Sequence, residues 1–473
     1  MKIPRPPGPS DRFLGLPLMR HMQRDFVGFW REAQQRYGDA IHMRVMGLDY
    51  YGFTHPEQIR EVLVEKADSF IRFERPIQVM SQLQGQSLLI TEGEVWRKQR
   101  RTLLPCFSAK RFPAYARQIT EAIDERLAGL PGDGATSVDF EREMNLLAID
   151  IIVRTTFGAG AGVDAAQIEH AVRVLGKIAY EEMFYPASLP DWLPLPYKRE
   201  KRRNSRLLDN LVWSQIHARR AAPEPGDDLL GMLLSATDDE GDGAALSDRE
   251  LRDQLITIFI AGHETTAAAL AWAGWALASH PDIASAAAEE VDRVLGGVAP
   301  TFADVARLPY LGMVIKESLR RYPPTPGVFT RRATADVQIG QWLVPKGSLV
   351  TTLSVLPQHD ERWFAQPERF DPSRFAANAP PIERGAYFPF GTGPRVCIGQ
   401  GVAVMQMSLT LAMLLQRFTL RPAPGQHEPQ VRAQVTLRPR DRLHLALQRR
   451  ACTATAAPTP HEGRSDHRCP FHA

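Results

Sequence analysis

Residues 390–399 read FGTGPRVCIG, so that three glycines and a proline surround a single cysteine. Directly after this stretch, the apolar run GVAVMQMSLTLAMLLQRF begins at Gly401 and has the composition of a buried helix. Backbone N–H groups at the start of a helix stabilise a thiolate, and glycines let the backbone approach a flat ligand closely. A single thiolate held in this way suits a metal whose other ligands come from a cofactor, although a lone cysteine is more often a small core residue.

The composition is that of a globular protein. The chain has 473 residues, 44% hydrophobic and 23% charged, and its formal charge of +3 is too close to neutrality to imply a nucleic-acid partner. Length alone leaves the number of domains open. The cysteines form no CxxC pair, which argues against a disulfide framework and a zinc ribbon. They are Cys106, Cys397, Cys452 and Cys469.

The N-terminal segment MKIPRPPGPSDRFLGL has no apolar core of the length that a signal peptide needs. Its prolines would also interrupt a membrane anchor. The sequence therefore predicts a cytoplasmic protein with no membrane anchor and with reduced cysteines.

Helical spacing of apolar residues dominates residues 114–320, whereas strand-like alternation is confined to short runs. We expect strands within residues 40–47, 49–55, 337–354 and 442–448. Because these runs are far apart in the chain, a sheet that contains them would join distant parts of the chain, which favours one domain. The predicted fold is mainly α with small β-sheets (α+β), in a single domain over residues 1–450.

Residues 451–473 lose all periodicity and are expected to form a disordered tail. The histidines of this tail and Cys469 could hold a metal, but irregular spacing in a flexible segment does not favour a site. We therefore assign the tail no function.

The apolar run LITIFIAGHETTAAALAWAGWALASHP begins at Leu255 and is long enough to span a bilayer. Glu264 lies at its centre, where an acidic residue costs about 2.5 to 3.5 kcal/mol, and the chain has no comparable second span. A long buried helix that ends at Pro281 is the better interpretation. His263 and Glu264 begin an HExxH pattern, but Ala267 occupies the position of the second histidine, which rules out the zinc-protease motif.

Glu264 and Thr265 place an acid beside a hydroxyl within this hydrophobic helix, with Gly262 shortly before them. In one interpretation the threonine bonds back to a helix carbonyl and the acid is paired elsewhere. In the other, the two side chains form a proton relay at a kinked helix that faces a cofactor. The stretch alone leaves both interpretations open.

The stretch 390–399 matches the pattern FxxGxRxCxG at every defined position and resembles the haem-binding loop of the cytochrome P-450 superfamily. Three further signatures of that family follow the family order: AGHETT from Ala261, ESLR over residues 317–320 and PERF over residues 367–370. The resemblance covers residues 5–448 and is closest to soluble bacterial members. It implies the cytochrome P-450 fold, with a long central helix over haem b (iron protoporphyrin IX).

The resemblance also implies roles for single residues. Cys397 is the expected axial ligand of the haem iron, and Thr265 and Glu264 are expected to deliver protons. Arg395, the pair Trp96 and Arg100, and Arg331 are expected near the haem propionates. The other expected cofactor-binding residues are Phe390, Gly391, Gly399 and Ala261.

Glu317 and Arg320 are three residues apart and share one face of a helix. Such a pair on its own is a common surface feature that contributes little. Together with Arg369 of PERF it resembles the family's buried network of one acid and two arginines. This network is expected to brace the cysteine loop and to have a structural role.

The predicted function is that of a haem-thiolate monooxygenase, which inserts one oxygen atom of O2 into a hydrophobic organic substrate by hydroxylation or epoxidation. The presence of both Glu264 and Thr265 favours this function, because family members that use peroxide directly or rearrange hydroperoxides often lack the pair. The alternatives are a peroxygenase or hydroperoxide isomerase on the same fold, and a non-catalytic haem-thiolate sensor. Secondary metabolism is the expected context.

The chain has no flavin, nicotinamide or iron–sulfur segment, so a separate ferredoxin or flavodoxin with its reductase is the expected electron donor. Arg97, Lys98 and Arg101 could attract such an acidic partner to a monomer. The basic run 198–206 is expected to be a solvated helix start. By family position the substrate is expected to contact residues 73–89, Ile258, Ala261 and residues 325–329, which are mostly apolar.

Overall fold

The computed structural model describes residues 4–158, 164–185, 187–223, 226, 228–238, 243, 245–433 and 435–450. The expected tail, residues 451–473, lies outside the described residues. The α-helices are α1 (Leu16–Arg24), α2 (Phe26–Tyr37), α3 (Pro56–Arg60), α4 (Glu74–Gln84), α5 (Gly93–Leu103), α6 (Phe112–Ala128), α7 (Phe140–Phe157), α8 (Ala165–Met183), α9 (Pro196–Ala221), α10 (Leu229–Ser235), α11 (Asp248–Ser279), α12 (Pro281–Leu295), α13 (Phe302–Val305), α14 (Pro309–Arg321), α15 (Val355–Gln358) and α16 (Gln400–Arg417). The strands are β1 (Ala40–Val45), β2 (Leu48–Phe53), β3 (Phe70–Arg72), β4 (Asp133–Asp139), β5 (Arg331–Ala333), β6 (Val337–Ile339), β7 (Trp342–Val344), β8 (Leu349–Thr351), β9 (Phe418–Pro422), β10 (Val431–Ala433), β11 (Leu437–Pro439) and β12 (His444–Arg449).

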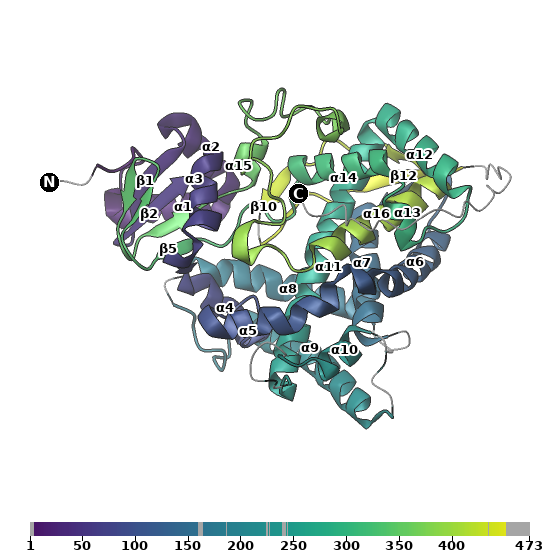
Figure 1. The fold of residues 1–473 in the computed structure, drawn as a ribbon, viewed down its shortest axis with the longest axis horizontal. Helices are drawn as coiled ribbons and strands as arrows, with labels where there is room; N and C mark the ends of the chain where they lie inside the picture. Colours follow the sequence, from purple (N-terminus) through teal and green to yellow (C-terminus); the bar gives the residue numbers. More distant parts are fainter. Residues whose placement is uncertain are drawn as a thin grey trace.

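A five-stranded sheet with the order β1-β2-β8-β5-β3 lies at one end of the molecule, beside α1 and α2 (Figure 1). Alternate residues of β1, including Ile41, Met43 and Val45, are buried, which is the period expected of a strand with one covered face. β2 pairs in parallel with β8, with Tyr50 opposite Leu349. The expectation that the sheet joins distant parts of the chain is confirmed.

The long helix α11 runs through the centre of the helical part and contacts α7, α9, α14 and α16 (Figure 1). Burial on nearly all sides explains why its sequence is apolar all round rather than amphipathic. α11 is the one helix among the described residues that is long and apolar enough to cross a membrane, judged by length and composition, and 67% of its apolar window is buried inside the protein. It is therefore a core helix, as expected.

α11 begins seven residues before Leu255, the start expected from its apolar run. The cause is a capping box: the Glu250 amide donates to Ser247 Oγ at 3.3 Å, and the Ser247 amide donates to Glu250 Oε2 at 2.9 Å. The added turns are polar in sequence and still largely buried. Pro281 then occupies the first position of α12, so the expected end of the helix is confirmed.

Three smaller sheets complete the fold: β4-β12-β9, β10-β11 and β6-β7. β12 overlaps the strand expected at residues 442–448, starting two residues later and ending one residue later. β11 lies close to α11, because the Trp272 Nε1–H donates to the Leu437 carbonyl at 3.0 Å. This contact brings the C-terminal segment against the central helix near the expected site.

Candidate functional site

The loop 390–399 is held in one conformation by its own backbone and by the N-terminal part of the chain. The Cys397 amide donates to the Phe390 carbonyl at 3.0 Å, which closes the loop. Gly393 has a φ of +73°, and a Cβ at this position would lie 2.0 Å from the Leu63 carbonyl oxygen, so no side chain fits. Gly391 also has a positive φ of +74°. The glycines therefore serve the close backbone approach that their spacing predicts.

Gly399 is the N-cap residue of α16, so Cys397 lies immediately before a helix start. Burial raises the pKa of the Cys397 thiol, while hydrogen bonds from the Gly399 and Gln400 amides and the charge of Arg100 act in the opposite direction. Cys397 is nevertheless exposed to solvent at the surface of the loop. No group of three or more His, Cys, Asp or Glu side chains among the described residues could hold a metal. Cys397 thus lacks companion protein ligands within the described residues.

Three guanidinium groups gather on one side of this loop, and a single carboxylate pairs with two of them. The Arg72 Nε–H donates to Glu92 Oε1 at 2.6 Å, and Arg395 also donates to Glu92. Burial and, to a smaller extent, the neighbouring charge of Arg72 lower the pKa of Arg331 to about 10. The same two causes lower the pKa of Arg395 to about 9. Arg332 faces elsewhere, because its Nε–H donates to Glu74 at 2.7 Å.

Trp96 and Arg100 join this cluster from α5. The Arg395 guanidinium lies over the Trp96 ring, 3.8 Å from its centroid, and the Arg100 guanidinium lies 5.9 Å from the same centroid. Arg100 also donates to the Val396 carbonyl at 3.1 Å, and burial lowers its pKa. The excess of positive charge beside an accessible cysteine fits the two propionates of haem, which would supply the missing anions.

Helix α11 presents an accessible stripe on its central part, beside the half-buried Ile260 and Glu264. Ile258, Ala261, Gly262 and Thr265 follow the spacing i, i+3, i+4 and i+7 and are exposed or half-buried, whereas the adjacent His263, Thr266 and Ala267 are buried. Ala261 is the most accessible of them. The sequence gives Ala261 a cofactor-binding role only through the family resemblance of AGHETT. The stripe is mostly apolar and carries one hydroxyl, that of Thr265.

The segment before α5 forms a wall along this part of α11. The Gln86 amide donates to Asp253 Oδ2 at 2.7 Å, and the Leu88 amide donates to Gln254 Oε1 at 2.9 Å. Asp253 and Gln254 belong to the turns of α11 that precede Leu255. The polar start of α11 therefore fastens the segment that is expected to contact the substrate.

Thr265 and Glu264 make the contacts of the first interpretation given above, in which the threonine bonds to a helix carbonyl and the acid is paired elsewhere. Thr265 Oγ1–H donates to the Ala261 carbonyl at 2.7 Å. Glu264 Oε1 accepts from Thr436 Oγ1–H at 2.9 Å and lies 3.3 Å from Arg438 Nη2. Glu264 is thus tied to the segment that carries β11, rather than to Thr265. The motif gave no sign of Thr436 and Arg438, because tertiary folding alone brings them there.

Glu317 and Arg320 form a fully buried bidentate pair, with distances of 2.7 Å and 2.9 Å. The expected third member, Arg369, is wrong: its side chain is exposed, and Arg374 Nε lies 3.4 Å from Glu317 Oε1 instead. The cause lies in the backbone, since Arg320 Nη2 donates to the carbonyls of Pro367 and Arg369 at 2.7 Å and 3.5 Å. This leaves the Arg369 side chain outside, and the next turn of chain returns Arg374 to the acid.

The basic run 198–206 differs from the expected solvated helix start. Lys198 and Lys201 are buried, and both bind the buried Glu182, at 2.6 Å and 2.8 Å. Of the residues expected to attract a redox partner, Arg97 pairs with Glu94, and Arg101 pairs with Asp238 at 3.1 Å. Two of the three expected docking cations therefore have carboxylate partners within the protein.

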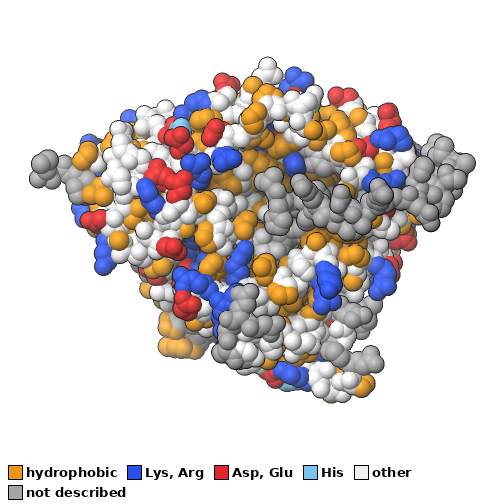
Figure 2. Space-filling model, in the orientation of Figure 1, with side chains coloured by type: hydrophobic (Ala, Val, Ile, Leu, Met, Phe, Trp, Pro, Cys, Tyr) orange, Lys and Arg blue, Asp and Glu red, His pale blue; other side chains and the backbone are white. Residues whose placement is uncertain are grey.

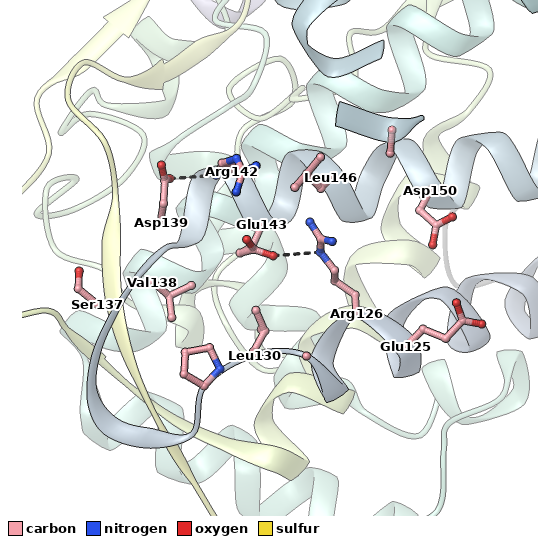
Figure 3. A pocket seen from close by; sticks show the side chains of 13 residues that line it. Glu125, Arg126, Leu130, Ser137, Val138, Asp139, Arg142, Glu143, Leu146 and Asp150 are labelled. Carbon is pink, nitrogen blue, oxygen red and sulfur yellow. Dashed lines mark hydrogen bonds and ion pairs between the residues drawn. The ribbon is translucent and has the colours of Figure 1, made fainter. Parts of the chain in front are cut away.

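A surface cavity of about 610 Å3 lies where α6, β4 and the start of α7 meet (Figure 3). Charged side chains dominate its wall, including Glu143, whose Oε2 lies 3.0 Å from Arg126 Nε, and Asp139, which caps α7 by accepting from the Arg142 amide at 3.1 Å. Neither Cys397 nor a residue of the α11 stripe lines it. A hydrophobic substrate has no match in this cavity.

A lone accessible thiol at a helix start, with arginines ready for two carboxylates and no protein co-ligand among the described residues, is the arrangement of haem-thiolate proteins. The family model described as Cytochrome P450 matches residues 4–446, and the chain belongs to that family. The chain is 33% identical over 422 residues to cyclooctat-9-en-7-ol 5-monooxygenase of Streptomyces melanosporofaciens, which covers 87% of this chain and 89% of the relative. It is 32% identical over 439 residues to cyclooctatin synthase of the same organism, with 91% and 92% covered.

Among solved structures, the chain resembles the retinoic acid-bound cyanobacterial CYP120A1, with a TM-score of 0.82 and 26% identity over 95% of this chain and all of that one. The family and the fold expected from the sequence are confirmed. Because the similar proteins include monooxygenases and hydroxylases of bacteria and plants, the chain is a cytochrome P450 monooxygenase with haem as its cofactor.

Proposed function

We propose that the Cys397 thiolate is the axial ligand of the haem iron and that the enzyme oxidises a hydrophobic, ring-containing substrate over the α11 stripe. The observation that carries this proposal is the accessible Cys397 thiol, which lies among the Gly399 and Gln400 amides and the Arg100 charge. The haem supplies the oxygen chemistry when bound, and thiolate ligation favours O–O cleavage. Phe390, Gly391 and Gly399 shape the loop that holds the sulfur.

Arg395, Arg331 and Arg100, with Trp96 as a stacking partner, would bind the propionates. Arg72 belongs to the same group, although no motif indicated it. Support comes from the lowered pKa values of Arg331 and Arg395, since an anion nearby would favour their charged forms and raise those values again. Glu92 pairs with Arg72 and Arg395 and so fixes the positions of two of these guanidiniums.

Thr265 and Glu264 would conduct protons to the reacting oxygen. The Thr265 hydroxyl already donates to the Ala261 carbonyl, so its oxygen can accept a hydrogen bond from a water or substrate group on the accessible stripe. Glu264 would have to exchange its contact with Arg438 for a contact toward the stripe, and its side chain is 15% exposed. The relay thus requires a rotation of Glu264 that the threonine does not need.

The Thr265→Ala variant tests the relay. We expect it to consume reductant at a rate near that of the parent while hydrogen peroxide replaces product. Thr266→Ala is the matched control, because that residue is buried on another side of α11. Parent-like product yield from Thr265→Ala would remove Thr265 from the mechanism. A peroxygenase would need no reductant, and a sensor would show no coupled turnover to lose.

The carbon monoxide difference spectrum of the reduced holoprotein tests the proposed ligand. The parent should show the strongly red-shifted Soret band of thiolate-ligated haem, and Cys397→Ser should lose that band. An unchanged band in the variant would assign the ligand to another residue.

The substrate class follows from the stripe and from the named relatives. Ile258, Ala261 and Gly262 offer no charge, and the wall at residues 85–89 adds Leu88. The relatives are named for cyclooctat-9-en-7-ol, 11-oxo-beta-amyrin and echinocystic acid, and the similar structure holds retinoic acid. We expect a ring-rich hydrocarbon compound of this kind, processed by hydroxylation or epoxidation in secondary metabolism, to shift the haem spin state on titration. Straight-chain fatty acids that bind more tightly would contradict this class.

The electron donor would be a separate ferredoxin or flavodoxin with its reductase. Arg97, Lys98 and Arg101 remain candidates for its docking site. Lys110 and Arg111 are exposed candidates near the start of α16, because the neighbouring Phe112 packs against Gly401. We propose a monomer in the cytoplasm, in which residues 1–450 form one haem domain. The exchange Lys110→Glu with Arg111→Glu should slow reduction by an acidic ferredoxin and leave the spectrum unchanged, whereas an unchanged reduction rate would place docking elsewhere.

A further inference from the structure

Several arginines surround the expected propionate site, and Glu92 is the one carboxylate within the described residues that pairs with any of them. These arginines form the arginine cradle, defined here as Arg72, Arg100, Arg331 and Arg395. Figure 2 shows that positive and negative side chains are interspersed on one face of the protein. The arginine cradle differs, because it contains more positive charge than its single acid can balance.

The orientation of Glu92 is not explained by the helix that it begins. Glu92 is the N-cap residue of α5, a position where the side chain commonly accepts from amides of the first turn, but it makes no such bond. Instead, Glu92 Oε1 accepts from the Arg72 amide at 3.1 Å and from Arg72 Nε–H at 2.6 Å. Glu92 Oε2 accepts from Arg395. Hydrogen bonds from two residues therefore direct this carboxylate toward the arginine cradle.

The other contacts of the arginine cradle add no negative charge. Arg72 and Arg331 are directly opposite each other in the antiparallel pair of β3 and β5, where like charges are unfavourable. The Arg331 side chain has no hydrogen-bond or ion-pair partner in the described part of the chain. Arg395 donates to the Thr91 carbonyl at 3.1 Å and lies over the Trp96 ring. Anions must therefore come from Glu92 and from the bound cofactor.

We propose that Glu92 remains a fixed counter-charge beside the haem in the holoprotein and lowers the reduction potential of the haem iron. This role rests on the proposed function, in which the propionates lie in the arginine cradle. The arginines would still outnumber the carboxylates with both propionates bound, so Glu92 can keep its charge. Reduction adds one electron to the iron, which the separate electron carrier supplies, and a negative charge nearby disfavours that addition.

Arg72 makes Glu92 a permanent part of the site. The Arg72 guanidinium also donates to the carbonyls of Leu89 and Thr91, and its side chain is 3% exposed. Arg72 is therefore held in place, and Glu92 would lose both of its bonds to Arg72 if it turned toward solvent. A propionate can share Arg395 with Glu92, because the guanidinium has N–H groups beyond those bound to Thr91 and Glu92.

The test is a spectroelectrochemical titration of the full-length holoprotein without substrate, which compares the reduction potential of the haem in the parent and in Glu92→Gln. Removal of the charge should raise the potential. At a fixed applied potential, the ratio of reduced to oxidised haem should rise about threefold to tenfold. This change corresponds to about 28 to 59 mV for a one-electron couple.

Three further variants separate the charge of Glu92 from its shape. Glu92→Ala also removes the charge, without placing an amide against the arginines, and should shift the potential in the same direction. Glu92→Asp keeps the charge and should stay close to the parent. Glu94→Gln is the matched control, because Glu94 lies on the same helix, is 80% exposed and pairs with Arg97 instead of the arginine cradle. Its potential should equal that of the parent.

A raised potential in a neutral Glu92 variant that binds haem, with Glu92→Asp and Glu94→Gln near the parent, would support the proposal. An unchanged or lowered potential in the neutral variants, or an equal shift in Glu92→Asp or Glu94→Gln, would overturn it. Loss of haem from both neutral variants would also overturn it, because Glu92 would then serve assembly. Failure of the proposed ligand is seen separately, as absence of the thiolate Soret band from the parent's carbon monoxide spectrum.

Discussion

His263 is buried in α11 with 2% of its surface exposed, and neither of its ring nitrogens has a hydrogen-bond partner among the described residues. Burial, with a smaller contribution from the charge of Arg438, lowers the pKa of His263 from 6.5 to about 3. The unfolded chain therefore binds a proton at this residue at pH 5, whereas the folded protein does not. Such a group stabilises the fold fully above pH 6.5, and its contribution is lost as the pH falls toward 3.

The loss follows from the two pKa values of His263. Between pH 8 and pH 5 the proton that the unfolded state gains lowers the free energy of unfolding by about 2 kcal/mol. His263→Leu, which has a similar volume, removes this proton site and the two unpartnered nitrogens. We expect the variant to be at least as stable as the parent at pH 8 and to gain about 2 kcal/mol relative to the parent at pH 5.

The measurement is urea unfolding of parent and variant at several pH values between 5 and 8, followed by tryptophan fluorescence and by circular dichroism. Free energies are compared where the two signals report the same transition. His217→Leu, on the exposed side of α9, is the control and should retain the pH dependence of the parent. The same slope for parent and His263→Leu would show that His263 binds a proton as readily in the folded protein as in the unfolded chain.

Three further predictions concern other parts of the fold. Gly393→Ala should abolish haem incorporation, because its Cβ would collide with a backbone oxygen at 2.0 Å. Gly391→Ala, whose nearest neighbour lies at 3.6 Å, should lower the free energy of unfolding by only about 1 to 2 kcal/mol because of its positive φ. Carbon monoxide spectra and unfolding curves distinguish these outcomes. Arg374→Ala should lower the free energy of unfolding by about 1 to 2 kcal/mol and Arg369→Ala by no more than about 0.5 kcal/mol; the reverse order would restore the network expected from the sequence. Burial raises the pKa of Asp39, but hydrogen bonds from Arg362 and Thr54 outweigh burial and bring that pKa to about 2. Asp39→Asn should therefore lower the free energy of unfolding by about 1 to 2 kcal/mol at pH 7. In an acid titration, this difference between parent and variant should vanish as the pH falls from 4 toward 2.

The sequence predicts those parts of the fold whose local pattern and tertiary environment agree. The sequence predicts β1, β2 and β12 from short strand-like runs, although burial alternates only along β1. β3 and β5 were missed: each has three residues, and its pairing partner lies far away in the chain. Ser247 and Glu250 form a capping pattern that marks the early start of α11, whereas the apolar residues alone place that start at Leu255.

The site divides in the same way. The sequence predicts the cysteine loop, because Cys397 and its glycines are close in sequence. It also predicts the pair Glu317 and Arg320, whose spacing of three residues places both on one helix face. Arg374 replaced Arg369 because backbone carbonyls occupy the inner side of the PERF turn, which a sequence motif does not show. Arg72 and Glu92 reach the arginine cluster only through the pairing of distant segments.

The parallel pairing of β2 with β8 has a consequence for synthesis. Tyr50 and Leu349 are separated by about 300 residues, so at about 5 to 20 residues per second the ribosome needs about 15 to 60 s to deliver the partner of β2. During this interval the hairpin of β1 and β2 presents an open edge that can pair with other chains. The cysteine loop emerges later still and packs against Leu63, so the cofactor pocket is completed only after the N-terminal edge has been closed. Slower translation or a shortage of chaperones should therefore reduce the yield of holoprotein through aggregation of nascent chains, before haem supply becomes limiting.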